Sequence, residues 1–197
     1  KSLIQYADVG VYSFNGNKSF TSGGGGALST NNRNLFQKAK ILAENGKSKG
    51  NYNYTMFGHN YKMTNIHAAI LKAQLSRYQE IKKNLVAINK EYKKKIVNSN
   101  FEFFNHKKNS NNILWLNFVL CNSKFISNKL IKYLRNKKIY SNCFWKPMHL
   151  QPIKKYLMFE KMNFTEQFFE RVVLIPSSSF LKKKDIRFVI KILNNFK

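Results

Sequence analysis

The sequence is poor in cysteine and histidine, and it lacks long apolar runs. Its two cysteines, Cys121 and Cys143, lie far apart without Cys-x-x-Cys spacing, which fits ordinary buried thiols in a reducing, cytoplasmic compartment. The four histidines show no metal-ligand spacing with one another or with the cysteines, so we expect no metal site. No apolar run approaches the length of a membrane-spanning helix, so we expect no membrane partner.

Acidic residues are also scarce, because nine Asp and Glu stand against 35 Lys and Arg and leave a formal charge of +26. Such a balance is typical of proteins that bind nucleic acid. However, lysine outnumbers arginine 30 to 5, the lysines are spread along the chain, and no nucleic-acid-binding motif accompanies them. The composition instead resembles the product of AT-rich codons, and a positive field would also steer a nucleotide diphosphate substrate toward the protein.

The chain of 197 residues, 43% of them hydrophobic and 15% aromatic, is long enough to build a core. Alternating strand and helix patterns predict an α/β arrangement. Thr64 is a plausible N-cap for a long bridging helix, with a domain boundary near residue 83. The predicted strands are 8–14 (buried), 26–30, 113–120 (buried), 139–145 and 173–175. The predicted helices are 33–46, 65–97, 125–137 (with an apolar face that includes Phe125), 160–172 and 185–196.

One lysine stands apart from the surface lysines. Lys18 follows a short apolar-polar run among small, uncharged neighbours, and four glycines, Gly23 to Gly26, come soon after it. A desolvated lysine has a lowered pKa, and its neutral amine can attack a carbonyl carbon to form a Schiff base. The glycines let the backbone approach such a site closely and adopt positive φ. We therefore favour a Schiff-base role for Lys18.

The local pattern leaves an alternative open, since a lysine before a glycine-rich turn is commonly a solvated loop residue. A phosphate-binding loop of the Walker type fits poorly. That loop places its Lys directly after the last glycine and before Ser or Thr, whereas here Lys18 precedes the glycines and Ala27 follows them.

Four ordered segments resemble the DegT/DnrJ/EryC1/StrS family of sugar aminotransferases, which use pyridoxal phosphate (PLP). The first, 8–32, holds Lys18 and the glycines. The second and third are GHNYKMTNIHAAILKAQL at 58–75 and FWKPMHLQPIKKY at 144–156. The fourth is LIPSSSFLKKKDIRFVIKIL at 174–193. Four blocks in order across nearly the whole chain make a chance match very improbable, and the similarity is greatest to the branch that aminates nucleotide-linked keto sugars for surface glycans.

The resemblance implies an α/β fold that is the C-terminal part of a fold-type I PLP-dependent transferase. Residues 1–83 would be the end of the PLP-binding large domain, and residues 84–197 would be the small C-terminal domain. In the family, a preceding portion carries the acidic residue that pairs with the PLP ring nitrogen, the side chain that stacks on the ring, and part of the phosphate cup. The chain begins at Lys1, so we expect a C-terminal fragment or one piece of a split gene.

The resemblance also assigns roles to particular residues. Lys18 would hold PLP covalently and then carry the proton between substrate and cofactor. The hydroxyl of Ser13 would bind the PLP phosphate, although a strand-end serine bonded to backbone is the interpretation without the family. Asn60 would reach across an isologous homodimer to the phosphate of the neighbouring subunit's PLP, whereas composition alone would make it a loop asparagine.

Three further residues would contact the substrate. Lys62 stands where the family usually has an arginine for the substrate diphosphate, so it keeps the charge but loses the bidentate fork. Trp145 would wall the substrate pocket or pack in the core. His149 would lie near the sugar nucleotide, or else be a partly exposed loop histidine. Asn142 and Cys143 stand where the family often has Arg-Pro, which bears on substrate specificity.

The resemblance implies a PLP-dependent aminotransferase that converts a nucleotide-linked keto sugar to an amino sugar, with glutamate as amino donor. Two alternatives from other classes remain. One is a catalytically inactive fragment that serves as a structural or dimerisation subunit. The other is a basic nucleic-acid-binding module, which would show steeply salt-dependent binding.

Overall fold

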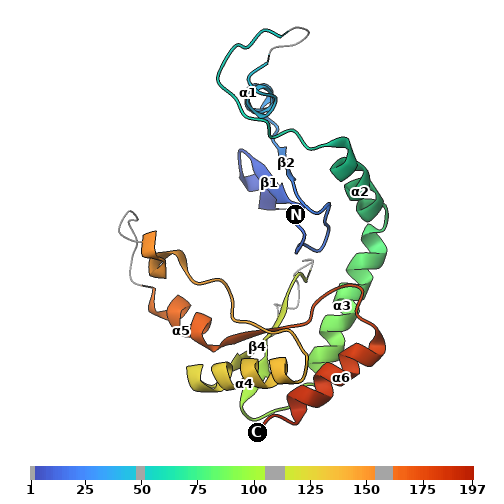
Figure 1. Ribbon diagram of the computed structural model, residues 1–197, viewed down its shortest axis with the longest axis vertical. Coiled ribbons are helices and arrows are strands. Elements are labelled where there is room, and N and C mark those ends of the chain that lie inside the picture. The colour runs from blue at the N-terminus through green and yellow to red at the C-terminus, as the bar shows by residue number, and fades with distance from the viewer. Residues whose placement is uncertain (1–2, 48–51, 105–113, 154–161) are drawn as a thin grey trace. The chain divides into compact units, whose positions relative to one another are not determined.

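A computed structural model describes residues 3–47, 52–104, 114–153 and 162–197 of the chain. It separates two compact units, Lys1–Tyr78 and Gln79–Lys197 (Figure 1). Strands and helices are mixed along the chain, as the predicted α/β class requires. The assignment of 1–83 and 84–197 to the large and small domains of a transferase stays a prediction.

The first unit is built on a hairpin. Strands β1 (Gly10–Ser13) and β2 (Gly26–Ser29) pair antiparallel, with Gly10 opposite Ser29 and Ser13 opposite Gly26. The other elements of this unit are η1 (Leu3–Tyr6), α1 (Arg33–Ala43) and α2 (Asn65–Ser76).

Side-chain caps set the start of both helices of this unit. The Asn32 side-chain oxygen accepts hydrogen bonds from the backbone of the first turn of α1, and Thr64 caps α2 as predicted. The predicted single helix over 65–97 is wrong in one respect, because α2 ends at Ser76 and α3 (Tyr78–Lys95) starts anew. At Arg77 between them, the backbone N–H bonds the Gln74 carbonyl three residues back, which tightens the turn.

The hairpin is not the buried structure that its apolar residues predict. Val11 on β1 is 81% exposed, and Leu28 on β2 is exposed as well. Among the side chains of the first unit whose burial is described, no hydrophobic one is buried. The physical reason is that the described residues of this unit pack no second layer on the two-stranded sheet, so its side chains have no interior to enter.

The second unit contains a three-stranded antiparallel sheet in the order β3-β4-β5. The strands are β3 (Phe101–Phe103), β4 (Asn117–Cys121) and β5 (Val172–Ile175). Around it lie α3, α4 (Lys124–Asn136), η2 (Met148–Leu150), α5 (Asn163–Arg171) and α6 (Lys183–Asn194).

The strand register gives the sheet two different faces. Phe103 pairs with Val119, and Val119 pairs with Val173, so these three side chains share one face. This face joins the buried core, together with apolar residues of α3, α4 and α6. Phe118 points to the opposite face, where it packs against aromatic rings, including Phe168 of α5.

The helices of the second unit follow their predicted apolar stripes, with one exception. Ile81, Leu85 and Tyr92 of α3 are buried as expected from their spacing. Leu130 of α4 is fully buried, but Phe125, which was expected on the same apolar face, is 73% exposed. It stands at the second position of the helix, where the described residues place no layer over it.

Two strand predictions need correction. Residues 139–145 form no strand, since the only backbone bond of this segment to β5 runs from the Leu174 amide to the Asn142 carbonyl, among the described residues. A side chain makes the second link, from the Ser141 hydroxyl to the Leu174 carbonyl. Strand β3 was not predicted, because three residues are too few to show an alternating pattern.

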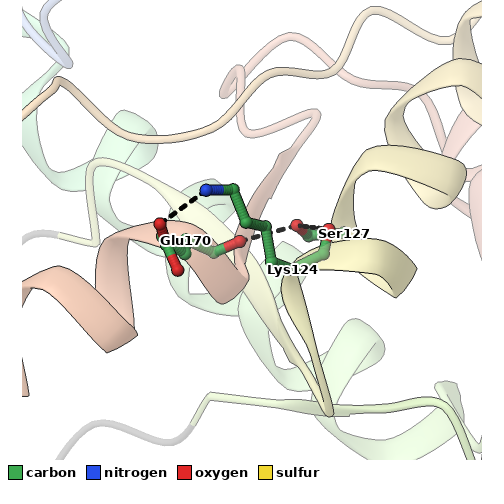
Figure 2. A network of polar contacts seen from close by, with 3 residues as sticks. All are labelled: Lys124, Ser127 and Glu170. Atoms are coloured by element: carbon green, nitrogen blue, oxygen red, sulfur yellow. Dashed lines mark hydrogen bonds and ion pairs between the residues drawn. The ribbon is translucent and has the colours of Figure 1, made fainter.

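Polar contacts close the second unit at two places. Figure 2 shows the first, in which Lys124 and Ser127 of α4 meet Glu170 of α5: the Lys124 amine lies 2.6 Å from the Glu170 carboxylate. At the second place, the Asn98 amide donates to the carbonyl oxygens of Leu193 and Phe196.

Candidate functional site

The hairpin of the first unit positions the candidate catalytic lysine. Ser13 is the last residue of β1, and the turn that follows is closed by a bond from the Lys18 amide to the Asn15 carbonyl, 3.0 Å long. The chain then turns back, and the Ser22 amide bonds the carbonyl of Phe14, the residue after β1, at 3.0 Å. Lys18 is thereby held, half-buried, in a tight turn directly beyond the strand.

The glycines that follow are required by the backbone. Gly23 and Gly25 have φ of +83° and +85°, a region that side-chain-bearing residues rarely adopt. A Cβ on Gly26 would lie 2.6 Å from the Tyr12 carbonyl oxygen on the paired strand. Gly24 differs from them, since its φ is not positive and a Cβ there would meet nothing within 4 Å. The loop is thus close-packed on one side and open at Gly24.

Two serine hydroxyls near Lys18 in the sequence, those of Ser13 and Ser19, have no hydrogen-bond partner among the described residues. The Ser19 hydroxyl is buried and has no hydrogen-bond partner among the described residues. Ser13 is exposed, and its hydroxyl bonds no described residue, so the strand-end serine bonded to backbone is not what the structure shows. A carbonyl-bearing phosphate ester needs an amine for its carbonyl and hydroxyl or N–H donors for its phosphate. Lys18, Ser13 and Ser19 offer these groups, so the residues present fit such a ligand.

Asn60 and Lys62 come together at the end of α1. Asn60 is exposed and forms an isolated β-bridge with Glu44, the residue that follows α1. The Lys62 amine lies 3.3 Å from the Glu44 carboxylate. This ion pair is at the surface, where such a contact contributes little to stability, so Lys62 can exchange it for another anion.

Two glycines allow the segment around Asn60 to cross α1 closely. A Cβ on Gly46 would overlap the Met56 carbonyl oxygen, and a Cβ on Gly58 would overlap the Gly46 amide. The same segment meets the glycine loop, because a Cβ on Gly25 would lie 2.9 Å from the Met63 methyl group. The structure therefore brings the residues next to Asn60 and Lys62 against the loop that follows Lys18.

Trp145 belongs to the second unit and lies in an aromatic stack. Its ring centroid is 5.5 Å from that of Trp115 and 6.0 Å from that of Phe144, both in stacked orientation. Trp145 remains 62% exposed, so the core-packing alternative does not describe it. A flat, exposed aromatic surface held from behind is suited to receive the ring of a ligand.

His149 is more enclosed than a loop histidine. It lies in η2, is buried, and its Nε2 is 3.2 Å from the Glu166 carboxylate of α5. The partly exposed alternative is therefore wrong for this residue. The carboxylate fixes the orientation of the imidazole ring.

Sequence reasoning missed the partners of these residues: Glu44 for Lys62, Met63 for the glycine loop, Trp115 for Trp145, and Glu166 for His149. The two acidic partners had a signal, because each is one of only nine acidic residues in a strongly basic chain. For Met63 and Trp115, nothing in the local pattern points to the contact.

Among the described residues, no cluster of three or more His, Cys, Asp or Glu could hold a metal ion. Nor does any described helix have both the length and the apolar character needed to cross a membrane.

Comparison with known proteins connects this geometry to a family. The sequence profile of the DegT/DnrJ/EryC1/StrS aminotransferase family matches residues 1–194. GDP-perosamine synthase of Vibrio cholerae is 28% identical over 201 residues, an alignment that covers 100% of this chain and 54% of that protein. The chain spans about half the length of the curated relatives it matches.

Solved structures show the same fold. The aminotransferase TlmJ from Streptoalloteichus hindustanus superposes with a TM-score of 0.90 at 21% identity, covering 98% of this chain and 53% of that one. PseC of Helicobacter pylori, an aminotransferase involved in the biosynthesis of pseudoaminic acid, gives a TM-score of 0.82 at 22% identity, with 95% and 53% covered. The fold is therefore that of part of a PLP-dependent sugar aminotransferase, as the sequence predicted.

Proposed function

Because the chain belongs to the DegT/DnrJ/EryC1/StrS aminotransferase family, we propose that the protein it forms part of transfers an amino group from glutamate to a nucleotide-linked keto sugar. Enzymes of this family use PLP, which supplies an electron sink when bound. The observation that carries the proposal is the position of Lys18, in a tight turn between a free serine hydroxyl and a glycine loop. The name of the Vibrio relative supports a sugar nucleotide as substrate.

In this proposal, Lys18 is the catalytic residue that this chain contributes. Its amine would hold the cofactor at the aldehyde carbon and, once released by the amino donor, would carry the proton to and from the substrate carbon. The turn that holds its backbone amide limits where the amine can reach, which keeps the proton transfer directed.

The phosphate end of the cofactor needs donors on both sides. Ser13 supplies a hydroxyl from the same protomer, and the exposed Asn60 supplies an amide to the site of a neighbouring protomer. This arrangement requires an isologous homodimer in which each site is completed by the other chain. We propose that such a dimer forms in the cytoplasm, in agreement with the free thiols of Cys121 and Cys143.

Three residues are proposed to bind the substrate. Lys62 leaves its weak surface pair with Glu44 to meet the diphosphate. The exposed face of Trp145 takes a ring of the sugar nucleotide. His149, oriented by Glu166, donates a hydrogen bond to a substrate oxygen.

Borohydride reduction in the presence of PLP tests the central role. The whole protein that carries this chain is incubated with PLP, reduced and digested, and the peptides are mapped for a pyridoxyl group on lysine. We expect the label on Lys18 and its loss in Lys18→Ala, while the exposed helix lysine in Lys38→Ala serves as the matched control. Amination of a keto sugar nucleotide by Lys18→Ala at the rate of the unmodified protein would rule the mechanism out.

Mixed dimers test the shared site. Lys18→Ala and Asn60→Ala variants are each inactive as homodimers in this proposal. A mixed dimer of the two contains one site with both defects and one site with neither, so mixing should restore part of the activity. If mixing restores nothing although mixed dimers form, Asn60 acts within its own protomer.

An alternative function is favoured by one observation. The first unit leaves large apolar side chains such as Val11, Phe57 and Ile66 exposed, which suits a chain that completes another polypeptide. A catalytically inactive subunit of this kind would form a stable complex and carry no PLP on Lys18. The reduction experiment therefore separates the two functions.

A further inference from the structure

A groove of about 490 Å³ lies in the second unit between α3 and α6. Asn84, Ala87 and Glu91 line it from α3, at spacings of three and four residues that place them on one helix face. Lys183 and Arg187 line it from α6, four residues apart and so also on one face. The groove is far larger than a gap between packed helices and has the volume of a small-molecule site.

The walls of this groove are strongly positive. Lys90, Lys95, Lys183 and Arg187 face it, against the single carboxylate of Glu91. The Lys95 amine lies 2.6 Å from that carboxylate and neutralises its charge. The hydrogen bond from Lys95 lowers the pKa of Glu91, and the charges of nearby cations, including Arg187, add to the effect. Lys90 and Lys183 form no ion pair with any described residue, so the groove keeps an excess of positive charge.

The floor of the groove is apolar. Ile88 of α3 and Ile186 of α6 are both buried and form part of the lining, together with Leu181 just before α6. The polar side chain of Ser179 lies at the same wall. Cations around an apolar floor complement a molecule that carries several negative charges on one part and a flat organic group on another.

We propose that this groove binds an organic polyphosphate of the nucleoside di- or triphosphate class. The phosphates contact Lys90, Lys183 and Arg187, and the organic group lies on the apolar floor. A monovalent carboxylate would leave most of this charge unmatched, whereas a polyphosphate brings three or four negative charges in a span of a few ångströms. The site consists only of residues of the second unit, so it does not depend on the proposed amino transfer at Lys18.

Calorimetry with ATP tests the proposal, using the whole protein that carries this chain. Two double variants each remove two positive charges from the helices that border the groove. Lys183→Gln with Arg187→Gln empties the groove of two cations, whereas Lys93→Gln with Lys184→Gln removes two exposed lysines that do not line it. We expect the groove variant to weaken ATP binding about tenfold or more, because charge-assisted contacts are lost, and the control to change it less than about threefold.

Further ligands and one further variant complete the test. Inorganic tripolyphosphate should bind more weakly than ATP, since it cannot use the floor, and adenosine should not bind measurably. Lys18→Ala should bind ATP as the unmodified protein does. Equal losses in the two double variants, no binding of ATP at millimolar concentration, or loss of binding in Lys18→Ala would each overturn the proposal.

Discussion

The hydroxyl of Ser127 donates a hydrogen bond to the backbone carbonyl of Glu170 over 2.6 Å, and so joins the first turn of α4 to the last turn of α5 (Figure 2). The carbonyls in the last turn of a helix have no partner within it, and Ser127 is buried, so water cannot replace the bond. We expect Ser127→Ala to lower the free energy of unfolding by about 1–2 kcal/mol. Urea unfolding followed by circular dichroism measures the loss.

Lys124→Gln is the matched control for that change, since Lys124 meets the same Glu170 through a partly exposed ion pair. A surface pair of this kind contributes less than about 1 kcal/mol. A greater loss in Lys124→Gln than in Ser127→Ala would show that the charge, and not the buried hydroxyl, holds the two helices together.

The glycine loop should tolerate a methyl group at one position and reject it at another. In Gly26→Ala the new Cβ meets the backbone oxygen of Tyr12, which cannot move without breaking the strand pairing. In Gly24→Ala the Cβ points into open space. We expect Gly26→Ala to lose PLP binding in the whole protein, measured by absorbance titration, and Gly24→Ala to keep it. Equal PLP affinities of the two variants would show that the hairpin shifts to accommodate the methyl group at residue 26.

The thiol of Cys121 should be chemically unreactive, and its titration should lower the free energy of unfolding at alkaline pH. Burial raises the pKa of this thiol to about 12 from an ordinary 9.0, and the charge of Arg171 offsets only part of the rise. In the native protein, iodoacetamide should therefore label Cys143, which is partly exposed, and spare Cys121. Mass spectrometry of the two tryptic peptides measures the difference, and equal labelling would contradict it.

The sign of the pH dependence follows from the same shift. The unfolded chain loses the Cys121 proton near pH 9, before the folded chain does. The contribution of Cys121 to stability is therefore complete below that pH and is lost as the pH rises toward about 12. A Cys121→Val variant should therefore lose less stability than the unmodified chain as the pH rises from 9.0 to about 12.

The two units should differ in hydrogen exchange when the chain is studied alone. The backbone of β4 lies in the middle of a sheet over a buried core, whereas β1 and β2 form an exposed pair. Opening of the hairpin costs little free energy, so its amides should exchange much faster than those of β4. Exchange followed by mass spectrometry tests this, and similar protection in both sheets would mean that the chain alone covers its hairpin.

Trp145 offers a test of the substrate surface. Because the ring is mostly exposed, Trp145→Ala should change the free energy of unfolding by less than about 1 kcal/mol. In the whole protein it should raise KM for the sugar nucleotide several-fold and leave kcat nearly unchanged, since it removes binding and no chemical group. A fall in kcat at constant KM would place Trp145 nearer the reacting atoms.

Local patterns predicted most of the elements, for reasons that the structure makes plain. The stripe Ile81, Leu85 and Ile88 repeats with the helical period and is buried, and Thr64 caps α2 because its hydroxyl can accept from the free amides of the first turn. The α/β class followed from the alternation of strand and helix patterns, and the family and its cofactor followed from four short blocks. The roles of the site residues stay predictions.

The errors came where long-range pairing decides the outcome. Residues 139–145 were predicted as a strand, yet the Ser141 side chain bonds the Leu174 carbonyl in place of the backbone bonds that a strand would make to β5. The apolar residues of β1 predict burial, but burial depends on a second layer, which the described part of this unit does not supply. The pair of His149 and Glu166 spans 17 residues, a distance at which no local period gives a signal.

The end of α3 is fastened to the end of α6, and this has a consequence for how the chain is made. Asn98 bonds the carbonyls of Leu193 and Phe196, and the amide of Asn194 bonds the carbonyl of Lys95, so contacts nearly a hundred residues apart close the core. A ribosome delivers Leu193 and Phe196 long after it has delivered α3. The part of the α3 stripe that α6 covers therefore stays exposed until α6 has been synthesised, and during that interval it can take part in aggregation.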